Sequence, residues 1–222
     1  MMGSVDGFVI AIDGPAASGK GTIAEGLGRA LSMPVLDSGL LYRAVGVTLT
    51  RQGGDPKDPK AAEVAALALD KDNLDDPGFR TREAGEAASQ VAVHPGVRSA
   101  LNAFQRAFAA QAGGAVIDGR DIGTVIAPDA PAKLFVTATP EVRAERRFKQ
   151  LTGQGEAVAF DDVLSDIRRR DERDMNRAAA PLVQASDAAL LDTTSMSISE
   201  AADAARRIVE EARARWETSH RG

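Results

Sequence analysis

Short apolar segments alternate with amphipathic stretches along the chain, and this alternation predicts the fold class. Each apolar segment is bounded by polar or glycine-rich sequence, which is typical of buried strands. The predicted strands lie at residues 8–12, 35–36, 115–117, 133–138 and 188–192. After the first of them, Ile23, Leu27 and Leu31 recur at helical spacing. Because parallel strands are joined by helical crossovers, the pattern predicts an α/β fold, a five-stranded parallel sheet with helices on both faces.

The other amphipathic stretches predict the domain organisation. Helices are expected after Ser38 and at about 61–69, 82–93, 95–111, 140–150, 160–177 and 199–215. Residues 52–97 hold helices but no strand, which indicates an insertion between strands of the main sheet. We expect a single domain over residues 1–222 that contains this insertion and a short lid at 151–165. No regular structure is expected at residues 1–7 and 217–222.

The segment at residues 14–22, between the first strand and its helix, carries the strongest motif. It reads GPAASGKGT and contains G-x-x-x-x-G-K, the phosphate-binding loop. Glycines let backbone N–H groups turn toward an anion, and the helix that follows adds its N-terminal dipole. Lys20 supplies a charge for the β- and γ-phosphates, and Thr22 brings the magnesium-binding hydroxyl one place later than usual, after Gly21. We predict that ATP with Mg²⁺ is held by Gly14, Pro15, Ala16, Ala17, Ser18, Gly19, Lys20, Gly21 and Thr22.

Composition narrows the possible functions. The 222-residue chain has a formal net charge of −5, which argues against bulk nucleic-acid binding. It has no cysteine, so disulfides and thiol nucleophiles are excluded, and its 2 histidines do not make a histidine-rich metal site. No stretch reaches the roughly 18 apolar residues of a membrane span, and no signal peptide is evident. We therefore expect a cytoplasmic protein without membrane partners.

An arginine-rich run at residues 168–177, RRRDERDMNR, is the second chemical signal. On a helix, Arg170, Asp174 and Arg177 fall at i, i+4 and i+7 and share a face. A charge run alone is more often a solvated face with ion pairs. Here arginine is in excess, and arginine binds phosphate through two parallel hydrogen bonds. The run is therefore a candidate phosphate site.

A third signal, DGRD at residues 118–121, follows the predicted strand 115–117 directly. Asp118 stands where an acid can orient magnesium through water in phosphate-loop enzymes. Arg120 is suited to hold a phosphate, and Asp121 to accept from an exocyclic amine such as the N4 amine of cytosine. The alternative is a tight turn with a local ion pair.

Together these segments resemble the bacterial cytidylate kinase family, within the nucleoside monophosphate kinases of the P-loop NTPase fold. The resemblance runs from IDGPAASGKGT and LDSGLLYR through ASQVAVHPGVR, DGRDIGTVIAPDAPAK and RRRDERDMNRAAAPLVQA to LLDTTSMSI. It implies transfer of the γ-phosphoryl group of ATP to CMP, and also to dCMP, in pyrimidine nucleotide metabolism. Similar enzymes are usually monomers, so we expect a monomer. Its partners would be the small-molecule substrates ATP and CMP or dCMP, and no nucleic acid.

The resemblance also implies roles for individual residues. Ser89, Arg98 and Asp121 would bind cytosine; Ser38, Arg170 and Asp174 the sugar; Arg43, Arg120 and Arg177 the monophosphate. Lys20, Arg120, Arg147 and Arg177 would surround the transferred group, and Thr22 and Asp118 would serve the metal. Residues 52–97 would bind the monophosphate and 151–165 would close as a lid. Family members usually carry a longer stretch, with β-strands, where this chain has only DKDNLDDPGF, which leaves open how the sugar is enclosed.

Other interpretations fit parts of the sequence. A kinase for another monophosphate or for shikimate would not need Asp121 and Ser89. A nucleotide-binding regulatory module would not need the arginine run. A nucleic-acid site at 168–177 is disfavoured by the acids interleaved there.

Overall fold

The computed structural model describes residues 7–71 and 73–220. The chain divides into two compact units, and each is described by itself. The first unit comprises Met1–Asp37, Gln105–Thr139 and Leu182–Gly222, and the second comprises Ser38–Phe104 and Pro140–Pro181. The first unit contains the sheet, and the second unit is helical.

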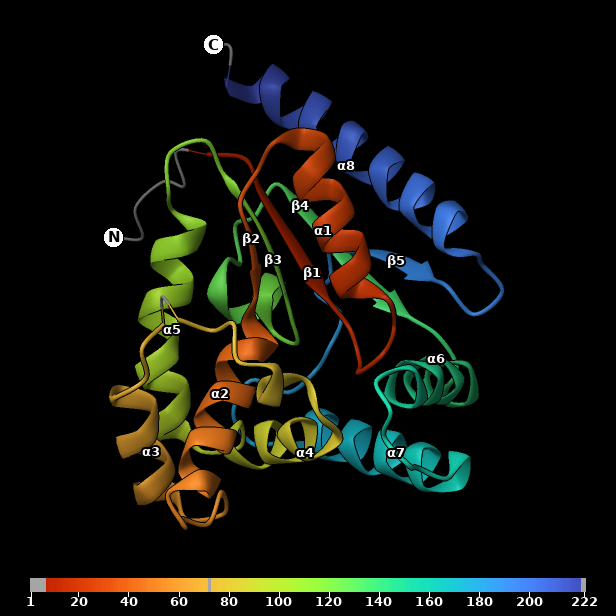
Figure 1. Cartoon of the computed structure of the whole chain (residues 1–222). Coiled ribbons are helices and arrows are strands. Elements are labelled where there is room, and N and C mark those ends of the chain that lie inside the picture. Colours follow the sequence, from red (N-terminus) through yellow and green to blue (C-terminus); the bar gives the residue numbers. More distant parts are fainter. Residues whose placement is uncertain (1–6, 72, 221–222) are drawn as a thin grey trace. The chain divides into compact units, whose positions relative to one another are not determined.

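The sheet of the first unit has five parallel strands in the order β2-β3-β1-β4-β5 (Figure 1). The strands are β1 (Val9–Asp13), β2 (Val35–Asp37), β3 (Ala115–Gly119), β4 (Ala132–Thr137) and β5 (Ala189–Asp192). The central strand β1 is buried along its whole length, as a strand covered on both faces must be. The predicted five-stranded parallel sheet is confirmed.

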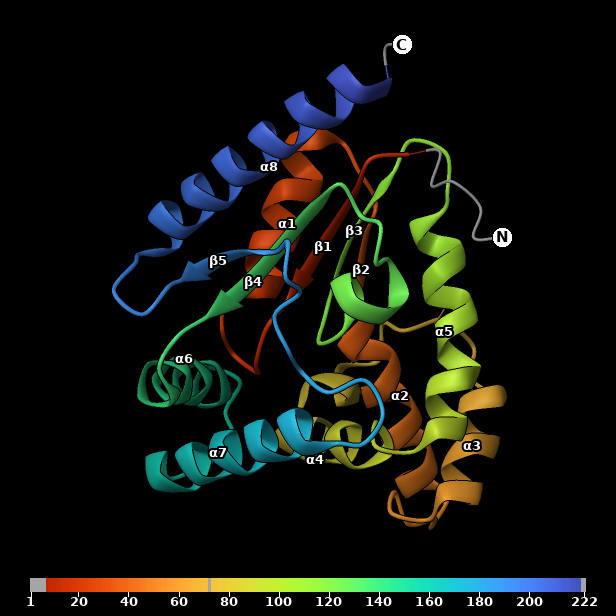
Figure 2. The ribbon, with the colours of Figure 1, turned by 180° about the vertical axis from the view of Figure 1, so that it is seen from behind.

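Helices α1 (Lys20–Leu31) and α8 (Ile198–His220) pack on one face of this sheet (Figure 1). Their apolar sides meet Ile10 and Ile12 of β1 in one hydrophobic core. A short π-helical turn, Ile122–Ile126, lies against β1 and β3 on the other face (Figure 2). The sequence pattern did not predict this turn.

The expectation of irregular structure from Glu217 onward is wrong for the part that is described. Helix α8 continues to His220. The ring of Trp216 packs on the ring of Phe8, with centroids 5.5 Å apart, and Arg213 pairs with Glu217 one turn later. These contacts hold the last turns of the helix. The expectation for residues 1–6 and 221–222 lies outside the described residues.

The second unit is built from helices whose bounds agree with the predicted ones within a few residues. They are α2 (Ser38–Arg51), α3 (Pro59–Leu67), α4 (Arg82–Val91), α5 (Pro95–Ala109), α6 (Pro140–Gly153) and α7 (Phe160–Asn176), with a 3₁₀ turn at Pro77–Arg80. Residues of α5 up to Phe104 belong to this unit. Its core joins Leu41 and Val45 of α2 to Val91 of α4 and Leu101 of α5.

The contact between α2 and α4 depends on a glycine, which has no side chain at the crossing. A Cβ at Gly46 of α2 would lie 2.7 Å from the Cβ of Ala87 on α4. The two helices can approach this closely only because glycine stands at the crossing.

We predict that Gly46→Ala lowers the free energy of unfolding by about 1–3 kcal/mol, because the added methyl overpacks the crossing. The matched control is Gly26→Ala in α1, where a Cβ meets nothing within 4 Å. That control should stabilise the protein by up to about 1 kcal/mol through helix propensity. Urea unfolding measures both, and equal stability of the two variants would contradict the packing argument.

Candidate functional site

The phosphate loop joins β1 to α1, and its backbone depends on two glycines. Gly14 has a φ of 153°, and a Cβ there would lie 2.0 Å from the carbonyl oxygen of Val136. Gly19 has a φ of 95°, in the left-handed region, directly before α1. Both positions therefore require glycine. Lys20 becomes the first residue of α1, so the loop leads into the positive end of the helix dipole.

Side chains from inside and outside the loop hold it in place. The Nζ of Lys20 donates to the carbonyl oxygen of Pro15 at 3.3 Å. The hydroxyl of Thr193 donates to the carbonyl oxygens of Ser18 and Thr137, each at 3.0 Å. The first turn of α1 contains no acidic residue. The loop is thus fixed, and no carboxylate of that turn opposes an incoming phosphate.

The two predicted metal residues lie in this same unit. Asp118, at the end of β3, is buried, and its Oδ2 would lie 4.0 Å from a Cβ at Gly21 in the first turn of α1. Thr22 is exposed in that turn. Within the described ranges, no group of three or more His, Cys, Asp and Glu residues could hold a metal ion by itself. A hydroxyl and a buried carboxylate are hard oxygen donors, which fit Mg²⁺ held together with triphosphate oxygens.

The segment between β3 and the π-helical turn carries Arg120 and Asp121. Asp121 is buried, and a guanidinium N–H of Arg120 donates to the carbonyl oxygen of Gly119 at 3.2 Å. The carboxylate of Asp13 accepts from the backbone N–H groups that follow, those of Ile122 at 2.8 Å and Gly123 at 2.7 Å. Burial raises the pKa of Asp13 to about 6, against the lowering effect of these two hydrogen bonds.

The other predicted residues belong to the second unit. Ser38 and Arg43 lie on α2, Ser89 on α4, Arg98 on α5, Arg147 on α6, Arg170 and Asp174 on α7, and Arg177 directly after α7. Ser38, Ser89, Arg98, Asp174 and Arg177 are buried, although their types are usually exposed. This unit therefore gathers polar side chains inside rather than on a solvated face.

The side chain of Arg170, on α7, reaches α4 one helical turn before Ser89. A Cβ at Gly85 would lie 2.9 Å from the Nη1 of Arg170, and Ser89 follows Gly85 by one helical turn on the same side. The hydroxyl of Ser89 is buried and has no hydrogen-bond partner among the residues that the structure describes. Buried hydroxyls are normally paired, so a ligand that completes this bond is the physical expectation.

Two further pairs form in this unit. The guanidinium of Arg98 on α5 stands 5.9 Å from the ring centre of Tyr42 on α2. Burial, followed by the charge of Arg43, lowers the pKa of Arg147. The charges of Arg43 and Arg147 therefore repel each other, while Glu156 and Glu83 act on Arg147 in the opposite direction.

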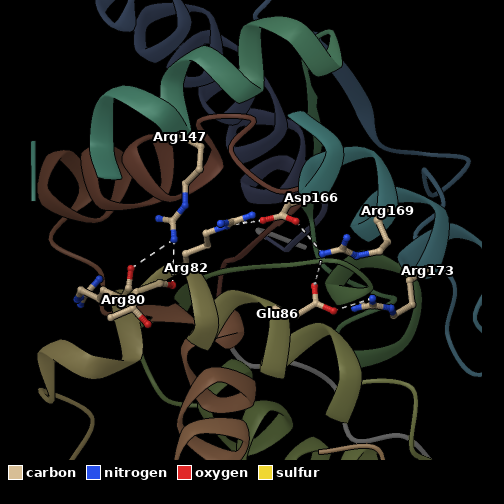
Figure 3. Close-up of polar contacts among 8 residues, drawn as sticks. Arg80, Arg82, Glu86, Arg147, Asp166, Arg169 and Arg173 are labelled. Carbon is tan, nitrogen blue, oxygen red and sulfur yellow. Dashed lines mark hydrogen bonds and ion pairs between the residues drawn. The ribbon is translucent and has the colours of Figure 1, made fainter. Parts of the chain in front are cut away.

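Arg147 also makes hydrogen bonds within the unit. It donates to the carbonyl oxygen of Thr81 at 3.0 Å, to that of Arg80 at 3.4 Å, and to the side chain of Gln150 at 2.9 Å. The two bonds to carbonyl oxygens link α6 to the segment directly before α4 (Figure 3). A small cavity beside them is lined by Arg82, Glu86, Arg147, Leu151, Val163, Asp166, Ile167 and Arg170.

A chain of alternating charges connects α4 to α7 (Figure 3). Asp166 accepts from Arg82 at 2.6 Å and from Arg169 at 2.7 Å. Glu86 accepts from Arg173 at 2.9 Å and lies 3.5 Å from Arg169. The ion-pair interpretation of the arginine run is thus correct for one of its faces, since Arg169 and Arg173 are paired here.

The structure therefore places the predicted residues in two sets. The first unit brings together the phosphate loop, Asp118, Arg120 and Asp121. The second unit holds the arginines and serines predicted for the acceptor, with Arg177 just past the helix on which it was expected. The sequence argument missed Asp13 and Glu86. For Asp13 a signal existed, because a charged residue ends a strongly apolar strand.

We predict that Glu86→Gln lowers the free energy of unfolding by about 1–2 kcal/mol, because it leaves Arg169 and Arg173 facing an uncharged group. The matched control is Glu141→Gln, which removes the exposed pair with Arg168 between α6 and α7. Exposed pairs contribute little, so this control should cost less than about 0.5 kcal/mol. Equal effects in urea unfolding would show that the chain of charges does not stabilise the unit.

Comparison with known proteins identifies relatives over almost the whole chain. A sequence model of the family described as cytidylate kinase matches residues 10–211. The cytidylate kinase of Caulobacter sp. (strain K31) is 67% identical over 209 residues, which cover 94% of this chain and 97% of that protein. The cytidylate kinase of Xanthobacter autotrophicus (strain ATCC BAA-1158 / Py2) is 62% identical over 207 residues, covering 93% of this chain and 99% of that protein.

Solved structures share the fold at low identity. A gluconokinase from Sinorhizobium meliloti 1021 superposes with a TM-score of 0.51 at 16% identity, covering 97% of this chain and 99% of that one. An uncharacterized protein from Eubacterium ventriosum ATCC 27560 gives a TM-score of 0.53 at 16% identity, covering 92% and 98%. The predicted P-loop α/β fold is confirmed. None of the described helices is long and apolar enough to cross a membrane.

Proposed function

Because this chain belongs to the cytidylate kinase family, we propose that it transfers the γ-phosphoryl group of ATP to CMP, giving ADP and CDP. As a member of that family it is an ATP-dependent kinase, a phosphotransferase. The observation that carries the choice of CMP is the 67% identity to a cytidylate kinase over 94% of the chain. We propose that dCMP is also accepted and that the reaction serves pyrimidine nucleotide metabolism.

The donor nucleotide is assigned to the phosphate loop. Gly14–Thr22 surrounds the triphosphate with N–H groups, and Lys20 neutralises the β- and γ-phosphates. The absence of acids from the first turn of α1 supports this assignment. Thr22, and Asp118 through water, would hold Mg²⁺, and the ion would neutralise charge on the donor phosphates.

The acceptor nucleotide is assigned to predicted site residues from the first and the second unit. Ser89, Arg98 and Asp121 bind cytosine; Ser38, Arg170 and Asp174 bind the sugar; Arg43, Arg120 and Arg177 bind the monophosphate. The buried hydroxyl of Ser89, which no described residue satisfies, supports the base contact. A serine hydroxyl, a guanidinium and a carboxylate complement the acceptors and the amine of cytosine.

Catalysis rests on positioning and charge neutralisation. The attacking phosphate is already an anion, so no general base is needed, and the obstacle is to align two polyanions. Lys20, Arg120, Arg147 and Arg177 surround the transferred group. Arg147 would then exchange its hydrogen bonds to the backbone of Arg80 and Thr81 for the phosphoryl oxygens.

Water must be kept from the transferred group. We assign residues 52–97 to monophosphate binding and 151–165 to a lid that closes over the nucleotides. Hydrogen exchange of the backbone amides in 151–165 should slow when ATP and CMP are added together. Unchanged exchange in that segment would contradict the lid. We also propose that the protein is a cytoplasmic monomer without nucleic-acid or membrane partners.

An acceptor panel tests the proposed reaction. ADP production, followed with CMP, dCMP, UMP, AMP and shikimate, should be fastest with CMP and dCMP, because Asp121 needs an amine that uracil lacks. Faster turnover with UMP or AMP would overturn the base assignment.

Arg177→Ala should lower kcat about 100-fold to 1000-fold, because removing a preorganised charge at the transferred group loses transition-state stabilisation. The control is Arg206→Ala, an exposed arginine of α8, which should leave kcat unchanged. Near-normal kcat in Arg177→Ala would remove this residue from the catalytic set.

A further inference from the structure

Asp13 is a buried acid that the proposed chemistry does not use. It ends the central strand, whose other residues are all apolar, and it is 4% exposed. Ile10 and Ile12 point into the core shared with α1 and α8, so the alternation of side chains along β1 places Asp13 toward the opposite face. A carboxylate in this position is costly unless hydrogen bonds compensate it.

Both oxygens of Asp13 are engaged by one short segment. Oδ1 accepts from the N–H of Ile122 at 2.8 Å, and Oδ2 accepts from the N–H of Gly123 at 2.7 Å. A Cβ at Gly123 would lie 3.4 Å from the same Oδ2 and 3.2 Å from the side chain of Lys133. Lys133 and the carboxylate of Asp13 therefore both lie against Gly123.

The segment that Asp13 holds carries the residues proposed to bind the acceptor. Arg120 and Asp121 come directly before Ile122. The carbonyl oxygen of Asp121 accepts from Val125 at 2.9 Å and from Ile126 at 3.3 Å. Because Asp13 accepts from the N–H of Ile122, the peptide group that joins Asp121 to Ile122 is held at both its oxygen and its N–H.

Asp13 also stands immediately before Gly14, the first residue of the phosphate loop. We infer that Asp13 is a positioning residue for phosphoryl transfer: it fixes the Arg120–Asp121 segment relative to the phosphate loop without touching either nucleotide. The inference rests on the proposed function, because it takes Arg120 and Asp121 as acceptor contacts. It adds Asp13 to the proposed site as a residue that acts through hydrogen bonds to the backbone.

The phosphate loop has supports that do not involve Asp13. Thr193 holds the carbonyl oxygen of Ser18, and Lys20 holds that of Pro15. Loss of the Asp13 carboxylate should therefore affect acceptor binding more than donor binding. This asymmetry separates a positioning role from a general loss of folded protein, which would change both KM values little and lower the apparent kcat.

The test is Asp13→Asn, which offers one acceptor oxygen and turns an NH₂ group toward the second backbone N–H. We expect the KM for CMP to rise about tenfold or more, as for loss of a charge-assisted hydrogen bond. The KM for ATP should stay within about twofold. Asp203→Asn on α8, which removes an exposed ion pair with Arg206, is the control and should change neither KM.

A pH profile provides a second readout. The charged groups on the elements packed against Asp13 are Asp118 on β3, Lys133 on β4, Lys20 on α1, and Arg120 and Asp121 after β3. Burial raises the pKa of Asp13 to about 6, so protonation below that pH weakens its hold on the two N–H groups. The ratio of the variant's KM for CMP to that of the wild type should therefore shrink as the pH falls through about 6. The titration of CMP itself cancels in this ratio.

Asp13→Glu keeps the charge but moves the carboxylate one methylene away from its place between the N–H groups of Ile122 and Gly123, and it serves if Asp13→Asn does not fold. It should also raise the KM for CMP selectively. An equal rise in both KM values, or no rise in either, would overturn the inference. CMP phosphorylation by the wild type is measured in the same assay. Its absence would overturn the proposed function, whereas normal wild-type activity with an unselective Asp13→Asn would overturn the inference alone.

Discussion

The passage of the chain from β1 into α1 is the constraint on which the first unit depends. Gly14 crosses the carboxyl end of β4 so closely that a side chain would collide with the carbonyl oxygen of Val136. This approach places the loop at the carboxyl edge of a parallel sheet, where open α/β sheets bind ligands. It also aims the N-terminus of α1 at that edge, so the backbone itself supplies the anion site.

Charged side chains are stabilised in different ways in the two units. In the first, three acids are buried at or just beyond the carboxyl ends of β1 and β3. Asp13 accepts from two N–H groups, Asp118 lies beside the turn where Mg²⁺ is proposed, and Asp121 directly precedes the π-helical turn. In the second, arginines outnumber acids within the run at residues 168–177. Glu86 and Asp166 pair with the arginines on one side of α7, and this pairing fixes the helix that carries Arg170 and Asp174. Arg169 and Arg173, which pair with these acids, thus share α7 with Arg170, for which a substrate contact is proposed.

The features that were predicted correctly from the sequence are those that short-range patterns determine. Apolar runs located the five strands, and the glycine spacing located the loop. The π-helical turn was missed because Ile-Gly-Thr-Val-Ile has no helical signal, and its N–H groups are held by Asp13, which lies 109 residues away from Ile122. The pair between Glu86 and Arg173 joins residues 87 positions apart, so spacing could not reveal it. The end of α8 was missed because Trp216 packs on Phe8 at the other end of the chain.

The central claim is that a glycine-dependent backbone loop binds the triphosphate. Titration calorimetry of MgATP with Gly14→Ala tests it most directly, with Gly26→Ala as the open-glycine control. We expect Gly14→Ala to bind MgATP at least about tenfold more weakly, since the loop must move away from Val136 and its N–H groups lose their common direction. The control should bind like the wild type. Unchanged affinity in Gly14→Ala would contradict the account.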